Sequence, residues 1–398
     1  MLKTFRKGIL TAAAAVLGAA LLGGCGSGTR ASDGLVHLNF QIWDNAQRGG
    51  MEAVARAYMD KNPEVEIQVQ VTSWDEYWTK LDAAAESGQL PDIFWMHTNQ
   101  ILKYADYGKL EDVTDLYDDV EPDYYTSHFS DISLANARGS DGRMYGVPKD
   151  KDTVCLVYNK EMFDAAGVAY PDESWTWDDL TSASAQIYER TGKYGYMAYA
   201  DEQLGYWNFV YQAGGYILNE DKTRAGFLDS GTRKAMEFYI GLQKEPWCPD
   251  QNYFAETAPG NAFMSEQGAM YLEGNWNLIS FMENNKEMIG KWDVAVLPKC
   301  PDTVRGDGRA TISNGLCYST GAKGKKLEYA RDFLKFAGSE EGQRVQGLSG
   351  AAIPAYKGLE DTWISAFDQY DYKLDVQKCV DMFPYGVQSV NNASRPNW

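Results

Sequence analysis

The chain has 398 residues, with 56 acidic and 37 basic side chains and a formal net charge of −19 at pH 7. A surface this acidic repels phosphate backbones and anionic lipid headgroups, which argues against nucleic acid and against polybasic membrane docking. The length exceeds that of one ordinary domain and suits two.

The first 24 residues are typical of a secretory signal peptide. A basic head precedes Ile9–Leu22, which is uncharged and rich in Ala, Leu and Gly. The following Gly-Gly-Cys resembles a bacterial lipobox, in which the cysteine receives a diacylglyceryl group. We therefore expect residues 1–24 to be removed and Cys25 to be lipidated, leaving residues 25–34 as a flexible tether with a reach of about 15–18 Å. An ordinary cleaved signal with a chance cysteine is the alternative.

The first lobe is predicted from a strand–helix–strand–helix–strand pattern. Apolar residues alternate with polar ones over 36–42 and 65–71, and a short apolar run covers 90–95. Helical spacing of apolar residues lies between them, at 51–59 and 74–81. This order favours a parallel sheet with right-handed crossovers, in which ligands bind beyond the carboxyl ends of the strands.

Each of these strand ends brings a tryptophan together with short hydrogen-bonding side chains. The three groups are Trp43-Asp44-Asn45, Thr72-Ser73-Trp74 and Trp95-Met96-His97-Thr98-Asn99. An indole face matches the C–H face of a pyranose, and carboxylates, amides and histidine match its hydroxyl groups. We interpret this edge as a sugar site, although burial in the core is the alternative for any single tryptophan.

A charged segment leads directly into a buried strand. Thr153–Tyr158 is an unbroken apolar and β-branched run, and the four residues before it, Lys149–Asp152, are all charged. Such charges are costly unless they line a wet cavity or pair with one another. We interpret 148–153 as a crossing from one lobe to another, with 310–314 and 349–354 as further crossings. A solvated turn before a core strand is the alternative.

A second α/β unit follows the crossing. Helices are predicted over 161–166, 177–190 and 232–243, and strands over 268–272 and 292–297. The first of these strands ends at Glu273-Gly274-Asn275-Trp276, again a tryptophan at a strand end.

The cysteines and histidines form no pattern typical of a metal site. Five cysteines follow residue 25, without CxxC spacing, which predicts neither a disulfide framework nor a zinc site. A single bridge, such as Cys248–Cys300, stays open. His37, His97 and His128 are not at ligand spacing from one another, so we expect no metal and no cofactor.

Several motifs occur in the order found in one known family. They include V-T-S-W-D-E-Y-W-T-K-L at 71–81, L-P-D-I-F-W-M-H at 90–97, Y-G-V-P-K-D at 145–150 and W-T-W-D-D-L at 175–180, with further matches at 50–54, 158–160, 163–167 and 347–354. The chain resembles the extracellular solute-binding proteins of carbohydrate ABC importers, the group that includes maltose-binding protein. The resemblance implies a two-lobed periplasmic-binding-protein-like (class II) α/β fold, with each lobe a mostly parallel sheet flanked by helices. The lobes would comprise residues 35–151 plus 310–350 and residues 152–309 plus 351–398, joined by hinge crossings.

The resemblance also implies ligand contacts at the edge already identified. Together with Trp74 and His97 from the strand ends, the candidate residues are Asp44, Asn45, Trp95, Thr98 and Asn99 in the first lobe, Asp152 at the crossing, and Trp207, Trp276 and the weaker match Glu202 in the second lobe. Thr98-Asn99 is less charged than the Asp-Arg pair of some relatives, so the identity of the sugar does not transfer.

We therefore predict the substrate-binding lipoprotein of an ABC importer. It would capture a mono- or oligosaccharide in the interlobe cleft and deliver it to transmembrane permease subunits. It would be a monomer, lipid-anchored on the outer face of the cell membrane, with no catalytic residue. A secreted glycoside hydrolase with Asp150 and Asp152 as acid and base is one alternative, although no second carboxylate is tied to them by the sequence. A sugar-sensing receptor lobe also stays open.

Overall fold

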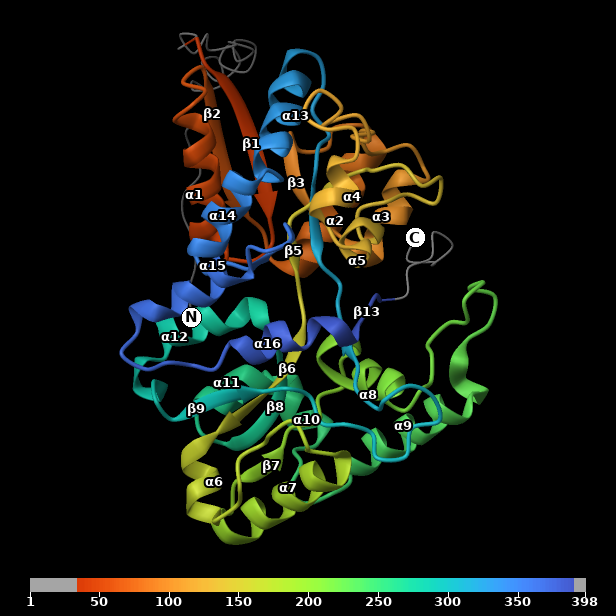
Figure 1. The fold of residues 1–398 in the computed structure, drawn as a ribbon, viewed down its shortest axis with the longest axis vertical. Helices are drawn as coiled ribbons and strands as arrows, with labels where there is room; N and C mark the ends of the chain where they lie inside the picture. The colour runs from red at the N-terminus through yellow and green to blue at the C-terminus, as the bar shows by residue number, and fades with distance from the viewer. Residues whose placement is uncertain (1–33, 390–398) are drawn as a thin grey trace, which may run out of the picture. The chain divides into compact units, whose positions relative to one another are not determined.

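The computed structural model describes residues 34–389 (Figure 1). The predicted signal peptide and Cys25 lie outside the described residues. Within the described part of the chain, no helix combines the length and the apolar character needed to cross a bilayer.

The first sheet has five strands in the order β2-β1-β3-β11-β4. They are β1 (Val36–Ile42), β2 (Val65–Val71), β3 (Ile93–His97), β4 (Val147–Pro148) and β11 (Leu316–Ser319). β1 pairs in parallel with β2 and β3, as the strand–helix–strand order predicts. β11 is antiparallel to both β3 and β4, so this sheet is mixed.

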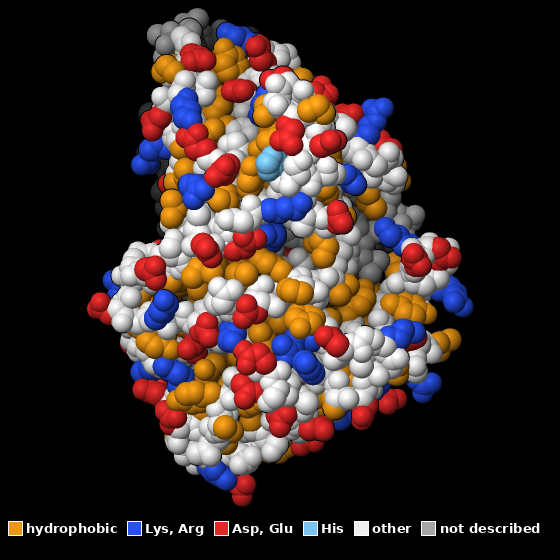
Figure 2. Space-filling view, in the orientation of Figure 1, with side chains coloured by type: hydrophobic (Ala, Val, Ile, Leu, Met, Phe, Trp, Pro, Cys, Tyr) orange, Lys and Arg blue, Asp and Glu red, His pale blue; other side chains and the backbone are white. Residues whose placement is uncertain are grey.

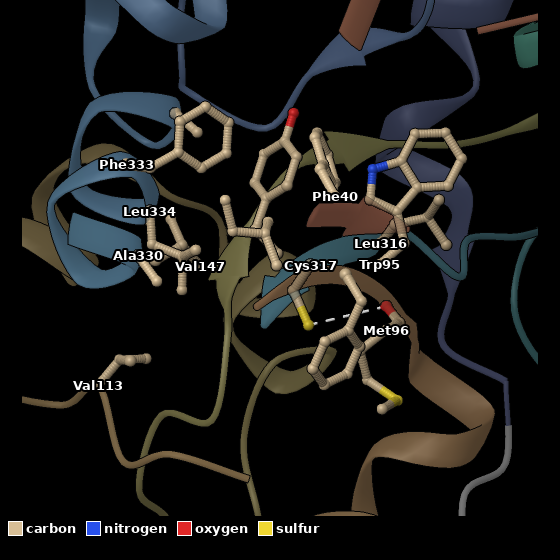
Figure 3. Packing of buried hydrophobic residues seen from close by; sticks show 14 of the residues in the cluster. Phe40, Trp95, Met96, Val113, Val147, Leu316, Cys317, Ala330, Phe333 and Leu334 are labelled. Atoms are coloured by element: carbon tan, nitrogen blue, oxygen red, sulfur yellow. Dashed lines mark hydrogen bonds between the residues drawn. The ribbon is translucent and has the colours of Figure 1, made fainter. Parts of the chain in front are cut away.

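Helices cover the first sheet and enclose its core; we call this sheet and its helices the first lobe (Figure 1). They are α1 (Arg48–Met59), α2 (Trp74–Ser87), α3 (Thr98–Ala105), α4 (Tyr124–His128), α5 (Asp131–Ala135), α13 (Lys325–Ala337) and α14 (Glu340–Leu348). α1 buries Met51, Val54 and Tyr58, which are spaced to share one helical face. Figure 3 shows Phe40 and Trp95 in this core, where Phe40 packs on Phe333 with ring centroids 5.7 Å apart.

The second sheet has four strands in the order β7-β8-β6-β9. They are β6 (Val154–Asn159), β7 (Tyr194–Tyr196), β8 (Gly268–Gly274) and β9 (Trp292–Ala295). Only β7 and β8 pair in parallel, because β6 is antiparallel to β8 and β9. The prediction of a mostly parallel sheet is therefore wrong here. The reason is geometric: β6 leaves the crossing whereas β8 returns to it, so that Val154 at the start of β6 pairs with Gly274 at the end of β8.

The second sheet and its helices form the second lobe. Its helices are α6 (Lys160–Ala166), α7 (Trp177–Thr191), α8 (Trp207–Gln212), α9 (Ser230–Leu242), α10 (Gln251–Glu256), α11 (Pro259–Met264), α12 (Leu278–Asn284), α15 (Glu360–Ser365) and α16 (Gln377–Asp381). α7 begins with a capping box between Thr176 and Asp179, and α6 ends at Gly167 with φ of 60°. All five cysteines among the described residues are unbridged and buried, so the Cys248–Cys300 bridge is not formed.

Short two-stranded pairings accompany the passages between the sheets. β5 (Asp150–Lys151) lies between β4 of the first sheet and β6 of the second, and it pairs with β12 (Ile353–Pro354). β10 (Thr311–Ile312) precedes β11 and pairs with β13 (Gly386–Val387). The predicted crossings 148–153 and 310–314 thus lie where the chain passes between the two sheets, and 349–354 lies between α14 and α15. The lobe boundaries stay predictions.

Candidate ligand-binding site

A cavity of about 830 Å³ is lined by both lobes and by the crossings. The first lobe contributes the ends of β1 and β3 and the starts of α2 and α3. The second lobe contributes residues 201–204 and the end of β8 with the residues that follow. Strand ends and helix starts therefore converge on this cavity, as the rule for open α/β sheets predicts.

Seven of the predicted site residues line the cavity. They are Asp44, Trp74, His97, Asn99, Asp152, Glu202 and Trp276. They come from segments that are up to 232 residues apart in sequence, and the fold brings them to one place.

Four predicted residues do not line it. Trp95 and Thr98 are fully buried, Trp207 is buried at the start of α8, and Asn45 is exposed outside the cavity wall. Trp95 lies under Trp43, with ring centroids 5.1 Å apart, so it supports the wall instead of forming it. The strand-end rule locates an edge but does not determine which of several consecutive side chains faces the ligand, because that depends on the pleat and on the packing below.

The first-lobe wall is a cluster of tryptophans centred on Trp43. The Trp43 ring lies 5.1 Å from Trp74 and 5.6 Å from Trp78, and Trp74 lies 5.4 Å from Trp78. Trp74 and Trp78 are one helical turn apart on α2, which places them on the same face. Trp74 has 41% of its surface exposed, whereas Tyr77 and Leu81 of the same helix are buried in the core. This wall offers edges and faces of indole to a ligand.

Asp44 is held at the start of α1. Its Oδ1 accepts a hydrogen bond from the Ala46 amide at 2.8 Å, and its Oδ2 accepts one from Gln47 Nε2 at 3.0 Å. Gln47 Oε1 in turn accepts from Lys149 Nζ at 2.8 Å. The cavity edge of the first lobe is thereby connected to the first crossing.

Part of the charge at the first crossing is balanced by a buried ion pair between Lys149 and Asp150. Lys149 is fully buried, and its Nζ lies 2.6 Å from Asp150 Oδ2 and 4.4 Å from the centroid of the Trp95 ring. Asp150 Oδ1 also accepts from the Leu316 amide at 2.6 Å, which connects the first crossing to the second. Asp150, Lys151 and Asp152 line the cavity. These charges are therefore paired or line the cavity, which are the conditions that make buried charges tolerable.

Asp152 joins three segments at the floor of the cavity. Its Oδ1 accepts from the amides of Asn314 and Gly315, the latter at 3.0 Å, and its Oδ2 accepts from Gln203 Nε2 at 2.8 Å. Burial, followed by the nearby Asp150, raises the pKa of Asp152 to about 7. Because Oδ1 already has two donors and Oδ2 has one, a single acceptor position is left for a ligand.

Two further asparagines at the floor carry polar atoms without partners in the described structure. Asn275 Oδ1 accepts from the Thr153 amide at 2.9 Å, but its Nδ2 has no partner among the described residues. Asn314 Oδ1 likewise has none, although Asn314 is only 3% exposed. Buried polar atoms without partners are uncommon and call for an explanation. A ligand hydroxyl, which both donates and accepts, would satisfy both kinds of atom.

His97 and the two aspartates offer little for catalysis or metal binding. Burial lowers the pKa of His97 to about 4, so the ring is neutral at physiological pH. No group of three or more His, Cys, Asp or Glu side chains in the described part of the chain could hold a metal ion. Asp150 and Asp152, the acid–base pair of the hydrolase alternative, each accept backbone hydrogen bonds that hold the crossings together.

Sequence reasoning missed several residues of the wall. Trp43 is adjacent to Asp44 in the predicted strand-end group but is not among the candidate residues, and Trp78 lies one helical turn after Trp74. The positions of both in the sequence could therefore have indicated the wall. No local sequence pattern indicated three other wall residues, Gln203, Asn275 and Asn314. They reach the cavity only because the second lobe packs against the crossings.

Residues 53–369 match the family model described as bacterial extracellular solute-binding protein. The chain belongs to this family. A binding protein of Brucella abortus is 24% identical over 267 residues, which cover 66% of this chain and 62% of the relative's length. The diacetylchitobiose binding protein DasA of Streptomyces coelicolor is 22% identical over 333 residues, or 83% of this chain and 76% of the relative.

The solved structures show the same fold. The ABC substrate-binding protein Lmo0181 of Listeria monocytogenes, in complex with cycloalternan, superimposes with a TM-score of 0.79 at 22% identity and covers 90% of this chain and 89% of that chain. The predicted two-lobed α/β binding-protein fold is therefore confirmed, with mixed sheets. Membership of this family places the chain among binding proteins rather than enzymes.

Proposed function

We propose that this chain is the substrate-binding lipoprotein of an ABC importer and captures a sugar or oligosaccharide in the cavity between its lobes. The observation that carries this proposal is the opposition of indoles across a polar cavity. Trp43, Trp74 and Trp78 line it from the first lobe and Trp276 from the second. Indole faces suit the C–H faces of sugar rings, and the carboxylates and amides between them suit hydroxyl groups.

The size of the cavity favours more than one sugar ring. Its volume of about 830 Å³ lies in the upper part of the range of roughly 300–1,000 Å³ found for small-molecule sites. The names of the relatives agree with this: DasA is a diacetylchitobiose binding protein, and Lmo0181 was solved with cycloalternan. At 22% identity these names support the class of ligand and not its identity.

The transport role assigns a partner and a location to the chain. Family membership supports delivery of the captured sugar to transmembrane permease subunits. The Gly-Gly-Cys pattern supports a lipid anchor at Cys25 on the outer face of the cell membrane. Capture would close the lobes by small backbone rotations at the crossings, as in other two-lobed proteins.

Calorimetric titration with a panel of neutral, amino and acidic oligosaccharides tests the sugar-binding role. At least one of them should bind, and no new reducing ends should appear during prolonged incubation. Trp74→Ala should weaken binding, whereas Tyr107→Ala, at an exposed residue of the same lobe outside the wall, serves as the matched control. Solution scattering should show a smaller radius of gyration at saturation. Absence of binding across the panel would overturn the proposal, and release of products would replace it with the hydrolase.

A further inference from the structure

The cavity wall carries an excess of carboxylates. Its lining includes the acidic side chains of Asp44, Asp82, Asp150, Asp152, Asp201 and Glu202, against the basic side chains of Lys103 and Lys151. His97 is neutral at physiological pH. The cavity has six acidic against two basic lining side chains, a larger excess than the 56 against 37 of the whole chain. On the face shown in Figure 2, acidic side chains are interspersed with Lys and Arg.

The basic side chains near the cavity are already engaged by carboxylates. Lys103 Nζ lies 2.7 Å from Asp82 Oδ1, Lys149 pairs with Asp150 at 2.6 Å, and Lys151 pairs with Glu360. Each of these three lysines is thus already paired with a carboxylate and offers no unpaired positive charge to an anionic ligand. Like charges that face each other in a partly desolvated site are unfavourable, so uronates and sugar phosphates are poor candidates.

Three carboxylates on three sides of the cavity have no basic partner in the part of the chain that the structure describes. Asp44 accepts only from Ala46 and Gln47, Asp201 accepts from the Leu204 amide at 2.7 Å, and the partners of Asp152 are amide groups. Asp44 belongs to the first lobe, Asp152 to the crossing and Asp201 to the second lobe. Because the pKa of Asp152 is about 7, its carboxyl group is largely protonated below that pH. A cation placed between the lobes would therefore be attracted mainly by Asp44 and Asp201, one on each lobe, and more strongly once closure excludes water.

The unpartnered acceptor of Asn314 and the indoles agree with a donor ligand, while the unpartnered donor Asn275 Nδ2 is left to a hydroxyl group of the sugar. Asn314 Oδ1 is an acceptor that lacks a donor among the described residues, although the residue is 97% buried. An ammonium group has three donors and no acceptor, so it matches this atom. The clustered indoles of Trp43, Trp74 and Trp78 can hold a cation over their faces as well as a neutral ring.

We propose that the preferred ligand of this cavity carries a protonated amine, which makes the substrate class amino-sugar oligosaccharides. This inference rests on the proposed sugar-binding function and specifies its ligand. It assigns Asp44 and Asp201 to charge recognition, Asp152 to hydrogen bonding and the indoles to the sugar rings. Neutral sugars of the same linkage would keep the indole contacts and the hydrogen bonds to their hydroxyl groups but would lose the charge attraction.

Titration with a matched set of disaccharides tests this inference. The set is a β-1,4-linked glucosamine disaccharide, its N-acetylated form, the corresponding glucose disaccharide and an acidic disaccharide of uronic acid, measured at pH 6.5 where the amines are protonated. The amine form should bind at least tenfold tighter than the two neutral forms, and the acidic form should bind weakest. Raising the salt concentration from 50 to 500 mM should weaken the amine form severalfold more than the neutral forms.

Variants test whether the preference for the amine disaccharide arises in the cavity. Asp44→Asn should reduce the preference for the amine over the neutral disaccharide by about tenfold. Glu86→Gln removes an equal charge from an exposed position on α2 outside the wall, and it should leave the preference unchanged. If Asp44→Asn does not fold, the salt dependence of the wild type still decides the question.

The outcomes separate this inference from the proposed function. Neutral disaccharides that bind as tightly as the amine form would overturn the inference and leave sugar binding intact. Binding of a plain polyamine such as spermidine, without binding of any sugar, would overturn both. Failure of every ligand would overturn the proposed function and this inference with it.

Discussion

Lys149 and Asp150 are adjacent in sequence and form a buried ion pair, with Nζ 2.6 Å from Oδ2, at the point where the chain leaves the first sheet. Asp150 lines the cavity, and Lys149 Nζ lies 4.4 Å from the centroid of the Trp95 ring. Through Gln47 it is joined to Asp44, and through the Leu316 amide it is joined to the second crossing. The same buried ion pair is therefore hydrogen-bonded to both the wall of the cavity and the second crossing.

Lys149→Met should destabilise the folded protein by about 3–5 kcal/mol, because it leaves the Asp150 carboxylate buried without its cation. Denaturant unfolding of the ligand-free protein measures this loss. The matched control is Lys80→Met, which breaks an exposed pair with Glu76 and should leave the midpoint unchanged within error. A loss from Lys149→Met no larger than that of the control would show that the pair contributes nothing to the fold.

The stability of the protein should depend on pH through Asp152. Its pKa rises from 3.8 in the unfolded chain to about 7 in the folded protein, so the folded state retains a proton that the unfolded state releases. The free energy of unfolding should therefore fall as pH rises from about 4 to 7, by an amount on the order of 2–4 kcal/mol from this group, and level off above that.

Comparison with Asp152→Asn isolates this contribution, because other groups titrate in both proteins. The difference in unfolding free energy between the variant and the wild type should grow in favour of the variant between pH 4.5 and pH 7.5. A difference that is constant with pH would mean that Asp152 titrates normally in the folded protein.

Trp74 and Trp95 should respond to truncation in opposite ways. Trp74 is 41% exposed on the cavity wall, so Trp74→Ala should cost about 2–4 kcal/mol of ligand binding and little stability. Trp95 is fully buried, so Trp95→Ala should cost about 3–5 kcal/mol of stability. Thermal unfolding without ligand and titration of the folded fraction separate the two effects. A Trp74 variant that melts as early as the Trp95 variant would place Trp74 in the core.

Membrane attachment should depend on Cys25. Cys25→Ala should release the protein from the membrane fraction, because acyl chains supply membrane affinity that an acidic surface cannot. Fractionation of cells expressing the wild type and the variant measures this. Ser27→Ala, two residues beyond the lipobox, is the matched control. A variant that stays with the membranes would contradict lipidation at this cysteine.

Local pattern in the sequence determined the elements of this fold and the edge where they meet. Alternation over 36–42 and 65–71, and helical spacing at 51–59, report the burial of neighbouring residues, which depends on a periodicity that the chain itself carries. The same patterns identified the strand ends at Asp44, His97 and Trp276, and the unusual charges of 149–152 indicated the crossing.

Only the tertiary structure decided which of those side chains reach the ligand. Trp95 and Trp43 both sit at strand ends, yet one is covered by the other, because burial depends on what packs above a residue. Strand direction in the second sheet was likewise set by where β6 and β8 meet the crossing. The contacts of Asp152 with Gln203, Asn314 and Gly315 join segments more than 50 residues away, and no local pattern encodes such contacts.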